Sequence, residues 1–129
     1  MIGPLPITIK RVICCGSRLW RDRRAIKSRL LLLPKDVVVV HGAHWEGADA
    51  IIMHVCFELG LKQEPHPADW DKHGKAAGPI RNSAMAQAGG NLCIAWWHPD
   101  AHAGTDDMLK KARRAHILTE TIRNGAKHG

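Results

Sequence analysis

The chain has 129 residues, of which 45% are hydrophobic and 24% are charged. This length fits one domain with a buried core and is too short for two ordinary domains, and the composition excludes an intrinsically disordered chain. The 19 Lys and Arg residues against 12 Asp and Glu give a formal net charge of +7. That charge favours anionic partners such as nucleotides, nucleic acid or an acidic membrane.

We expect neither a localisation signal nor a metal site from the sequence. Because no run of 18 apolar residues occurs, we expect no transmembrane helix, and the two prolines within residues 1–10 argue against a signal peptide. Of the nine histidines only His98 and His102 have a tempting spacing, and they lie in a loop, so we expect no metal site. Four cysteines without a C-x-x-C spacing are typical of reduced thiols in a cytoplasmic protein: Cys14, Cys15, Cys56 and Cys93.

The first half of the chain alternates between strand and helix patterns. The β-rich run 7–15 stops at Gly16, and Asp22 is a candidate N-cap for a helix that runs to about Leu33. The continuous apolar run 37–41 predicts a strand that is buried on both faces of a parallel sheet.

The pattern continues through the second half. Residues 48–59 keep the 3.6-residue period of an amphipathic helix, with Gly60 as its C-cap. A short strand over 61–64 and a long loop over 65–78 follow, and a loop of that length is usually functional. The remaining predicted elements are a helix over 79–88, a strand over 91–97, a helix from Thr105 or Asp106 to about Ala115, a strand over 117–122 and a frayed tail over 123–129.

This alternation predicts an α/β fold, a single Rossmann-like domain with its core at about residues 8–122. We expect a mainly parallel five-stranded sheet with helices on both faces. Ligands of such sheets bind at the carboxyl ends of the strands. The loops that should gather at that edge are 16–18, 41–49, 70–85 and 99–107.

Several of these loops could bind an anion. The loop before residue 79 places Arg81 in the first turn of a helix, where unpaired N–H groups and a guanidinium suit a phosphate. Gly16-Ser17-Arg18 offers amides, a hydroxyl and a charge, and Gly104-Thr105 offers a second phosphate cradle. The alternative for Arg81 is an ordinary surface arginine at a helix start.

Two further features suit the rest of a nucleotide. Asp49 could either cap the helix that starts nearby or accept hydrogen bonds from a ribose, and Gly42 and Gly47 allow close approach. Four tryptophans lie near the loops, and an indole ring such as that of Trp70 can stack on a nucleobase. For Trp96, on a buried strand, core packing is the alternative.

The motifs of these loops, taken in chain order, resemble those of the YspA-type (YpsA-related) family of the SLOG superfamily over roughly residues 8–120. The resemblance implies a Rossmann-like fold and a site for a nucleotide-derived ligand such as ADP-ribose or an NAD derivative. Many relatives are bacterial or phage proteins, proposed as ligand sensors or base-clipping hydrolases. The motifs are Gly16-Ser17-Arg18, His41-Gly42 with Gly47-Ala48-Asp49, Ala68-Asp69-Trp70 with His73-Gly74 and Ala77-Gly78, Arg81-Asn82-x-x-Met85, and Gly104-Thr105-x-x-Met108.

The same superfamily includes the LOG phosphoribohydrolases, which cleave the N-glycosidic bond of nucleoside monophosphates. Their R-K-x-x-M and P-G-G-x-G-T-x-x-E motifs are similar to the Arg81 and Gly104 segments here, but Met108 stands where the motif has its catalytic glutamate. Because a methionine can neither move a proton nor stabilise an oxocarbenium-like centre, Asp107, Asp106 or Glu46 would have to replace it.

Three functions are compatible with these features. The first is binding or sensing of a nucleotide-derived ligand, with no other cofactor required. Its ligand-binding residues would be Gly16, Ser17, Arg18, His41, Gly42, Gly47, Asp49, Trp70, Arg81, Asn82, Gly104 and Thr105. The second is an N-glycosidic hydrolase that uses Arg81, Asp107 and Glu46.

The third function is nucleic-acid binding, suggested by the superfamily's DNA-processing protein A group and by a basic cluster. The alternative for that cluster is a solvated helix face. We further expect a homo-oligomer in a bacterial cytoplasm, encoded by a bacterium or a phage, with no membrane partner. The cluster comprises Lys10, Arg11, Arg18, Arg21, Arg23, Arg24, Lys27 and Arg29.

Overall fold

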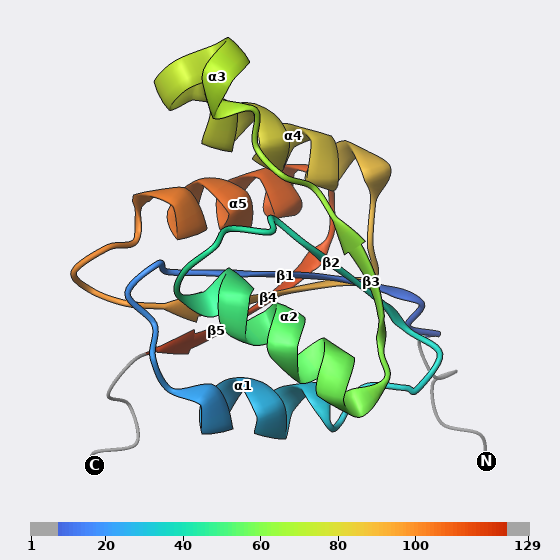
Figure 1. The fold of residues 1–129 in the computed structure, drawn as a ribbon. Coiled ribbons are helices and arrows are strands. Elements are labelled where there is room, and N and C mark those ends of the chain that lie inside the picture. The colour runs from blue at the N-terminus through green and yellow to red at the C-terminus, as the bar shows by residue number, and fades with distance from the viewer. Residues whose placement is uncertain (1–7, 124–129) are drawn as a thin grey trace.

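The computed structural model describes residues 8–123 and confirms the predicted α/β class (Figure 1). Five strands, all parallel, form one sheet in the order β3-β2-β1-β4-β5. In chain order the elements are β1 (Arg11–Gly16), α1 (Arg23–Leu30), β2 (Val38–His41), α2 (Ala48–Leu59), β3 (Lys62–Pro65), α3 (Trp70–His73), the 3-10 turn η1 (Gly74–Ala76), α4 (Ala77–Ala88), β4 (Leu92–Trp97), α5 (Ala103–Arg114) and β5 (Leu118–Arg123).

The strand order reverses between β1 and β4. The chain moves outward from β1 to β3, then crosses back to place β4 on the other side of β1. Because parallel crossovers are right-handed, the two halves put their helices on opposite faces: α1 and α2 cover one, and α4 and α5 cover the other (Figure 1). A crevice is therefore expected outside the carboxyl ends of β1 and β4.

Each face of the sheet has its own hydrophobic core. Side chains alternate along β1, so Val12 points into the cluster that contains Trp20 and Trp96, whereas Ile13 points into the one that contains Met85 and Met108. All six side chains are at most 1% exposed. The continuous apolar strands are thus explained by burial on both faces, as the sequence indicated.

The first predicted helix begins as expected but is too long at its end. Asp22 is the N-cap, because its Oδ1 accepts a hydrogen bond from the Ala25 N–H at 3.1 Å. α1 ends at Leu30 rather than Leu33, and the chain passes through a turn before Pro34. The proline disfavours helical geometry in the residue before it, so the last turn unwinds.

The predicted loop 65–78 is partly wrong, because it contains α3 and η1. Asp69 caps α3 by accepting the Lys72 N–H at 3.1 Å, and α4 begins at Ala77, two residues earlier than predicted. Pro79 sits in the first turn of α4, where a missing N–H costs nothing. The helix start was missed because Ala76, the N-cap, has no capping side chain and α4 begins with an alanine and a glycine.

The ends of the chain also differ from the prediction. α5 starts at Ala103 with His102 as N-cap, so neither Thr105 nor Asp106 caps it, and Thr105 is buried in the first turn. β1 begins at Arg11, so residues 8–10 of the predicted run 7–15 are not part of the strand and residue 7 lies outside the described residues. β5 extends through Arg123. The rest of the predicted tail lies outside the described residues.

Gly47 should tolerate no side chain. Its φ is +72°, and a Cβ there would lie 2.3 Å from the Arg18 Cα, so Gly47→Ala should lower the free energy of unfolding by about 3 kcal/mol. Gly60 also has a φ of +72° but open space around it, so Gly60→Ala should cost only about 1 kcal/mol. Urea titration of both variants measures the difference, and equal losses would show that the contact with Arg18 is not what excludes a side chain.

Glu64 should make stability depend on pH. The Arg11 guanidinium donates to both carboxylate oxygens, at 2.5 and 2.9 Å, and with His66 lowers the pKa of Glu64 to about 2. Because the folded pKa lies below the unfolded value near 4.5, this stabilisation is complete above that pH and is lost as the pH falls toward about 2.

The carboxylate is 37% exposed, so solvent screening limits the effect to about 1 kcal/mol. Urea titrations at pH 6 and pH 3 should show that Glu64→Gln removes this part of the acid sensitivity. An unchanged pH dependence in the variant would assign it to other carboxylates.

Candidate functional site

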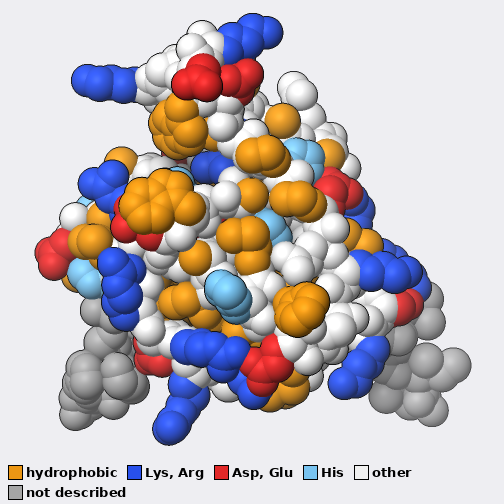
Figure 2. All heavy atoms as spheres, in the orientation of Figure 1, with side chains coloured by type: hydrophobic (Ala, Val, Ile, Leu, Met, Phe, Trp, Pro, Cys, Tyr) orange, Lys and Arg blue, Asp and Glu red, His pale blue; other side chains and the backbone are white. Residues whose placement is uncertain are grey.

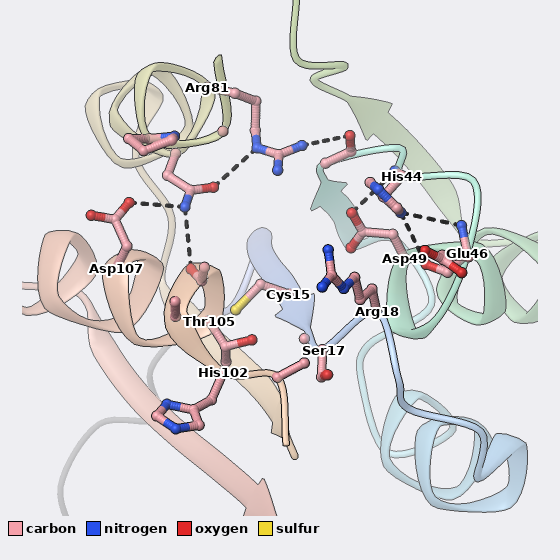
Figure 3. A pocket seen from close by; sticks show the side chains of 18 of the residues that line it. Cys15, Ser17, Arg18, His44, Glu46, Asp49, Arg81, His102, Thr105 and Asp107 are labelled. Carbon is pink, nitrogen blue, oxygen red and sulfur yellow. Dashed lines mark hydrogen bonds between the residues drawn. The ribbon is translucent and has the colours of Figure 1, made fainter. Parts of the chain in front are cut away.

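A cavity of about 680 Å³ lies at the carboxyl edge of the sheet, where the strand order reverses (Figure 3). Loops after β1, β2 and β4 line it together with α3 and α4, so the four predicted loops converge. Ten of the twelve predicted ligand-binding residues line the cavity: Gly16, Ser17, Arg18, Gly42, Asp49, Trp70, Arg81, Asn82, Gly104 and Thr105. The candidate catalytic residues Glu46 and Asp107 line it as well.

The backbone of Ser17 joins three elements beneath the cavity. Its N–H donates to the Trp96 carbonyl at 3.0 Å, and its carbonyl accepts from the Ala48 N–H at 2.9 Å. The adjacent Gly16 must be glycine, because a Cβ there would lie 2.6 Å from the Ala48 Cβ and 2.8 Å from the Trp96 carbonyl oxygen. The ends of β1 and β4 and the start of α2 are therefore fixed relative to one another.

Arg18 leaves this junction with its side chain exposed. Figure 3 shows its guanidinium pointing into the cavity. Among residues 8–123 no carboxylate lies within ion-pair distance of it. Its charge is therefore available to an anionic ligand.

Arg81 enters the cavity from α4. Arg81 is the fifth residue of the helix and lies in its second turn. The sequence analysis had predicted the first turn, so that prediction is wrong. Its NH1 donates to the Gly42 carbonyl at 2.6 Å and more weakly to the His66 carbonyl at 3.4 Å, and its Nε donates to Asn82 Oδ1 at 3.0 Å. Neutral oxygens hold the guanidinium in place, and no carboxylate of the described residues forms an ion pair with it, although Asp49 is close enough for the Arg81 charge to oppose the rise in its pKa that burial causes.

Asn82 and Asp107 connect α4 to α5 at one side of the cavity. The Asn82 amide donates to Asp107 Oδ2 at 3.0 Å and to the Gly104 carbonyl at 3.3 Å. Lys111 contacts the same Asp107 oxygen at 2.9 Å. One oxygen of this candidate catalytic carboxylate is thus already occupied by two donors.

Asp49 and Glu46 supply the carboxylates on the opposite side. Asp49 is 8% exposed and accepts the His44 N–H at 3.1 Å, so it fixes the loop before α2. It does not cap α2 as the alternative prediction had it, because the N-cap is Gly47 and no side chain caps this helix. Burial raises the pKa of Asp49, while the His44 N–H and the nearby Arg81 charge oppose that rise. Glu46 is partly buried and lines the cavity.

The N-terminus of α5 presents unbonded amides to the cavity. The first intrahelical bond runs from the Asp106 N–H to the His102 carbonyl at 2.8 Å, so the amides of residues 103–105 have no intrahelical acceptor. The His102 ring does not cap them, because its Nδ1 contacts Asp106 Oδ2 at 2.6 Å. A Cβ on Gly104 would meet nothing within 4 Å, which leaves room beside these amides.

Two predicted ligand-binding residues lie outside the cavity lining. His41 is 1% exposed; its Nδ1 accepts the Ala43 N–H, so Nε2 carries the proton and donates to Gln63 at 2.8 Å. Gly47 packs against the Arg18 backbone. Both residues shape the β2–α2 loop and do not reach the cavity.

The tryptophans separate into distinct roles. Trp70 lines the cavity and is 50% exposed, whereas Trp45 is 79% exposed outside it and stacks on His44. Trp96 is fully buried in the core, which confirms the packing alternative. Trp97 lies at the end of β4, where its Nε1 donates to Asp106 at 2.9 Å.

The sequence analysis missed some of the lining. Cys15 forms part of the floor, with its sulfur facing the cavity in Figure 3. A hydrogen bond with Cys93 and burial raise the pKa of its thiol well above the usual value, so it stays protonated near neutral pH. Its place at the carboxyl end of a predicted strand was the available signal. Other lining residues belong to the predicted loops but were not among the predicted ligand-binding residues, and they include His44, Gly78, Pro79 and the segment 99–103.

Metal and membrane features can be described only for residues 8–123. Within this part of the chain no three His, Cys, Asp or Glu side chains cluster as metal ligands would. No helix in the same part is long and apolar enough to cross a bilayer.

Comparison with known proteins agrees with the motifs. Residues 10–73 match the model of the YspA, cpYpsA-related SLOG family. The Gene 61 protein of Mycobacterium phage D29 is 37% identical over 120 residues, which cover 84% of this chain and 93% of that relative. This relative fits the expected bacterial or phage origin. No solved structure gives a significant match.

Fold, motif order and phage relative agree, and the chain belongs to the YspA, cpYpsA-related SLOG family.

Proposed function

We propose that the cavity binds a nucleotide-derived ligand and acts as a binding or sensing site. The observation that carries the proposal is the convergence of uncompensated positive groups. Arg18 and Arg81, neither of which has an ion-pair partner among the described residues, line one cavity with the free amides of residues 103–105. A phosphate group matches that arrangement, because amides at a helix N-terminus and a planar guanidinium both favour its oxygens.

The other walls suit the rest of a nucleotide. Asp49 is a buried carboxylate at the cavity surface with one oxygen bonded to His44, which leaves acceptor capacity for ribose hydroxyls. Trp70 offers a half-exposed indole on α3 whose ring packs near Gly78, and a nucleobase can stack on such a face. The proposal needs no further cofactor.

Removing a cavity charge should weaken binding. Arg18→Ala loses a charge-assisted contact, so calorimetry with AMP and ADP-ribose should show Kd raised about 10- to 100-fold. Arg24→Ala removes the same charge from an exposed position on α1 outside the cavity and should leave Kd unchanged. Binding of no nucleotide to the wild-type protein would refute the proposal.

A hydrolase is the second candidate, and the carboxylates at the cavity favour it. Met108, at the position of the LOG glutamate, is fully buried in the core and cannot serve. Glu46 faces the cavity from the β2–α2 loop, while Asp107 faces it from α5 with one oxygen occupied. Of the two, only the Glu46 carboxylate accepts no hydrogen bond from the described residues, so it is better placed to activate a water.

Base release from a nucleotide panel, followed by chromatography, tests this candidate. Glu46→Gln should abolish release, because the amide cannot take a proton from water. Asp106→Asn should not, since Trp97 and His102 hold Asp106 outside the cavity lining. Absence of release from the wild type, or undiminished release from Glu46→Gln, would leave a binding site without this chemistry.

Nucleic-acid binding is less well supported, because most residues of the basic cluster form ion pairs with carboxylates. Five of the eight residues have acidic partners: Lys10 with Asp36, Arg11 with Glu64, Arg23 and Lys27 with Glu58, and Arg29 with Glu120. On the face seen in Figure 2, basic and acidic side chains are interspersed and form no continuous basic surface. The homo-oligomer and the cytoplasmic location remain predictions.

A further inference from the structure

Arg81 borders a second cavity as well as the first. This hollow has a volume of about 330 Å³ and lies between the β3–α3 loop, α3 and α4. Pro67, His73, Ile80 and Ala84 are among the residues that line it, and Arg81 is the one residue on the linings of both cavities in the described part of the chain. The two hollows are therefore neighbours on either side of one side chain.

The helical repeat of α4 explains this division. Ala77, Ile80 and Ala84, spaced by three and four residues, form one stripe that faces the second cavity. A neighbouring stripe that includes Asn82 and Met85 faces the first cavity. Arg81 lies at the boundary between the stripes.

The Arg81 guanidinium is fixed at this boundary. NH1 bridges the Gly42 carbonyl of the β2–α2 loop and the His66 carbonyl of the β3–α3 loop, at 2.6 and 3.4 Å. The guanidinium of Arg81 is thus a positive charge at the boundary between the two cavities, called the ridge below, and no described carboxylate forms an ion pair with it. An anionic linker that crossed the ridge would supply the missing charge.

The second cavity has the chemistry of a ring-binding pocket. Ile80 is 45% exposed, and with Pro67 and Ala84 it gives an apolar wall. His73, on α3, also lines this cavity and makes no side-chain hydrogen bond or ion pair with the described residues. A planar or saturated ring with apolar faces and polar edges would bury the wall and find a partner in His73.

We propose that the second cavity is a subsite for a second ring of the ligand, so that the ligand is a two-part nucleotide whose diphosphate crosses Arg81. This inference rests on the proposed function, since the first cavity must hold the nucleoside half. The second ring is either a sugar or a second nucleoside, and both share the diphosphate linker.

Calorimetry with four probes tests the subsite: AMP, ADP, ADP-ribose and NAD. ADP carries the diphosphate without a second ring, so it isolates the ring's contribution. We expect ADP-ribose or NAD to bind about tenfold more tightly than ADP, because the added ring buries apolar surface. A gain seen with ADP-ribose alone identifies a sugar subsite, and a further gain with NAD identifies a nucleoside subsite.

Ala84→Phe fills the second cavity from an exposed position on α4. It should reduce the affinity for the two-ring ligand to that for ADP and should leave the affinity for ADP unchanged. Ala88→Phe places the same ring one turn further along α4, outside both cavities, and should change neither affinity. Ile80→Ala removes the wall and should weaken only the two-ring ligand.

Two outcomes overturn the subsite while the nucleotide site stands. In the first, ADP binds to the wild type as tightly as both two-ring ligands. In the second, Ala84→Phe weakens ADP and the two-ring ligands equally. If none of the four probes binds, the proposed function fails, and the subsite fails with it.

Discussion

The structure depends on the close approach of β1, β4 and α2 around Ser17. Hydrogen bonds from the Ser17 backbone fasten the ends of the two strands to the start of the helix, and Gly16 permits the contact because no side chain fits between Ala48 and Trp96. The strand order reverses at this point. Gly16 and Ser17 also line the cavity, so the contact that holds these three elements together forms one wall of the cavity.

The distribution of charge separates the surface from the cavity. Most of the basic cluster is neutralised by surface carboxylates, and such exposed pairs contribute little to stability. Arg18 and Arg81 are different, because Arg18 forms no ion pair within residues 8–123 and Arg81 is held by neutral oxygens. The formal charge of +7 is therefore less informative than the position of two guanidinium groups that form no ion pair with any described residue.

Hydrogen bonds within the chain hold two of the carboxylates that line the cavity. Asp49 is immobilised by His44, and Asp107 by Asn82 and Lys111. Both groups position walls of the cavity through their hydrogen bonds. Glu46 is the one candidate catalytic carboxylate that makes no such bond to the described residues, which is why hydrolysis remains a second candidate.

The sequence by itself determined the alternation of strands and helices, the parallel sheet, and the loops that meet at its carboxyl edge, because apolar periodicity and glycine positions are local signals. Only the tertiary structure decided which residues in those loops face the cavity. His41 is the last residue of a strand, as predicted, but its side chain forms a hydrogen bond with Gln63. Cys15, interpreted as a core thiol, reaches the floor of the cavity. The orientation of a loop side chain depends on partners distant in sequence: Arg81 is held by Gly42 and His66, and local sequence patterns carry no information about such contacts.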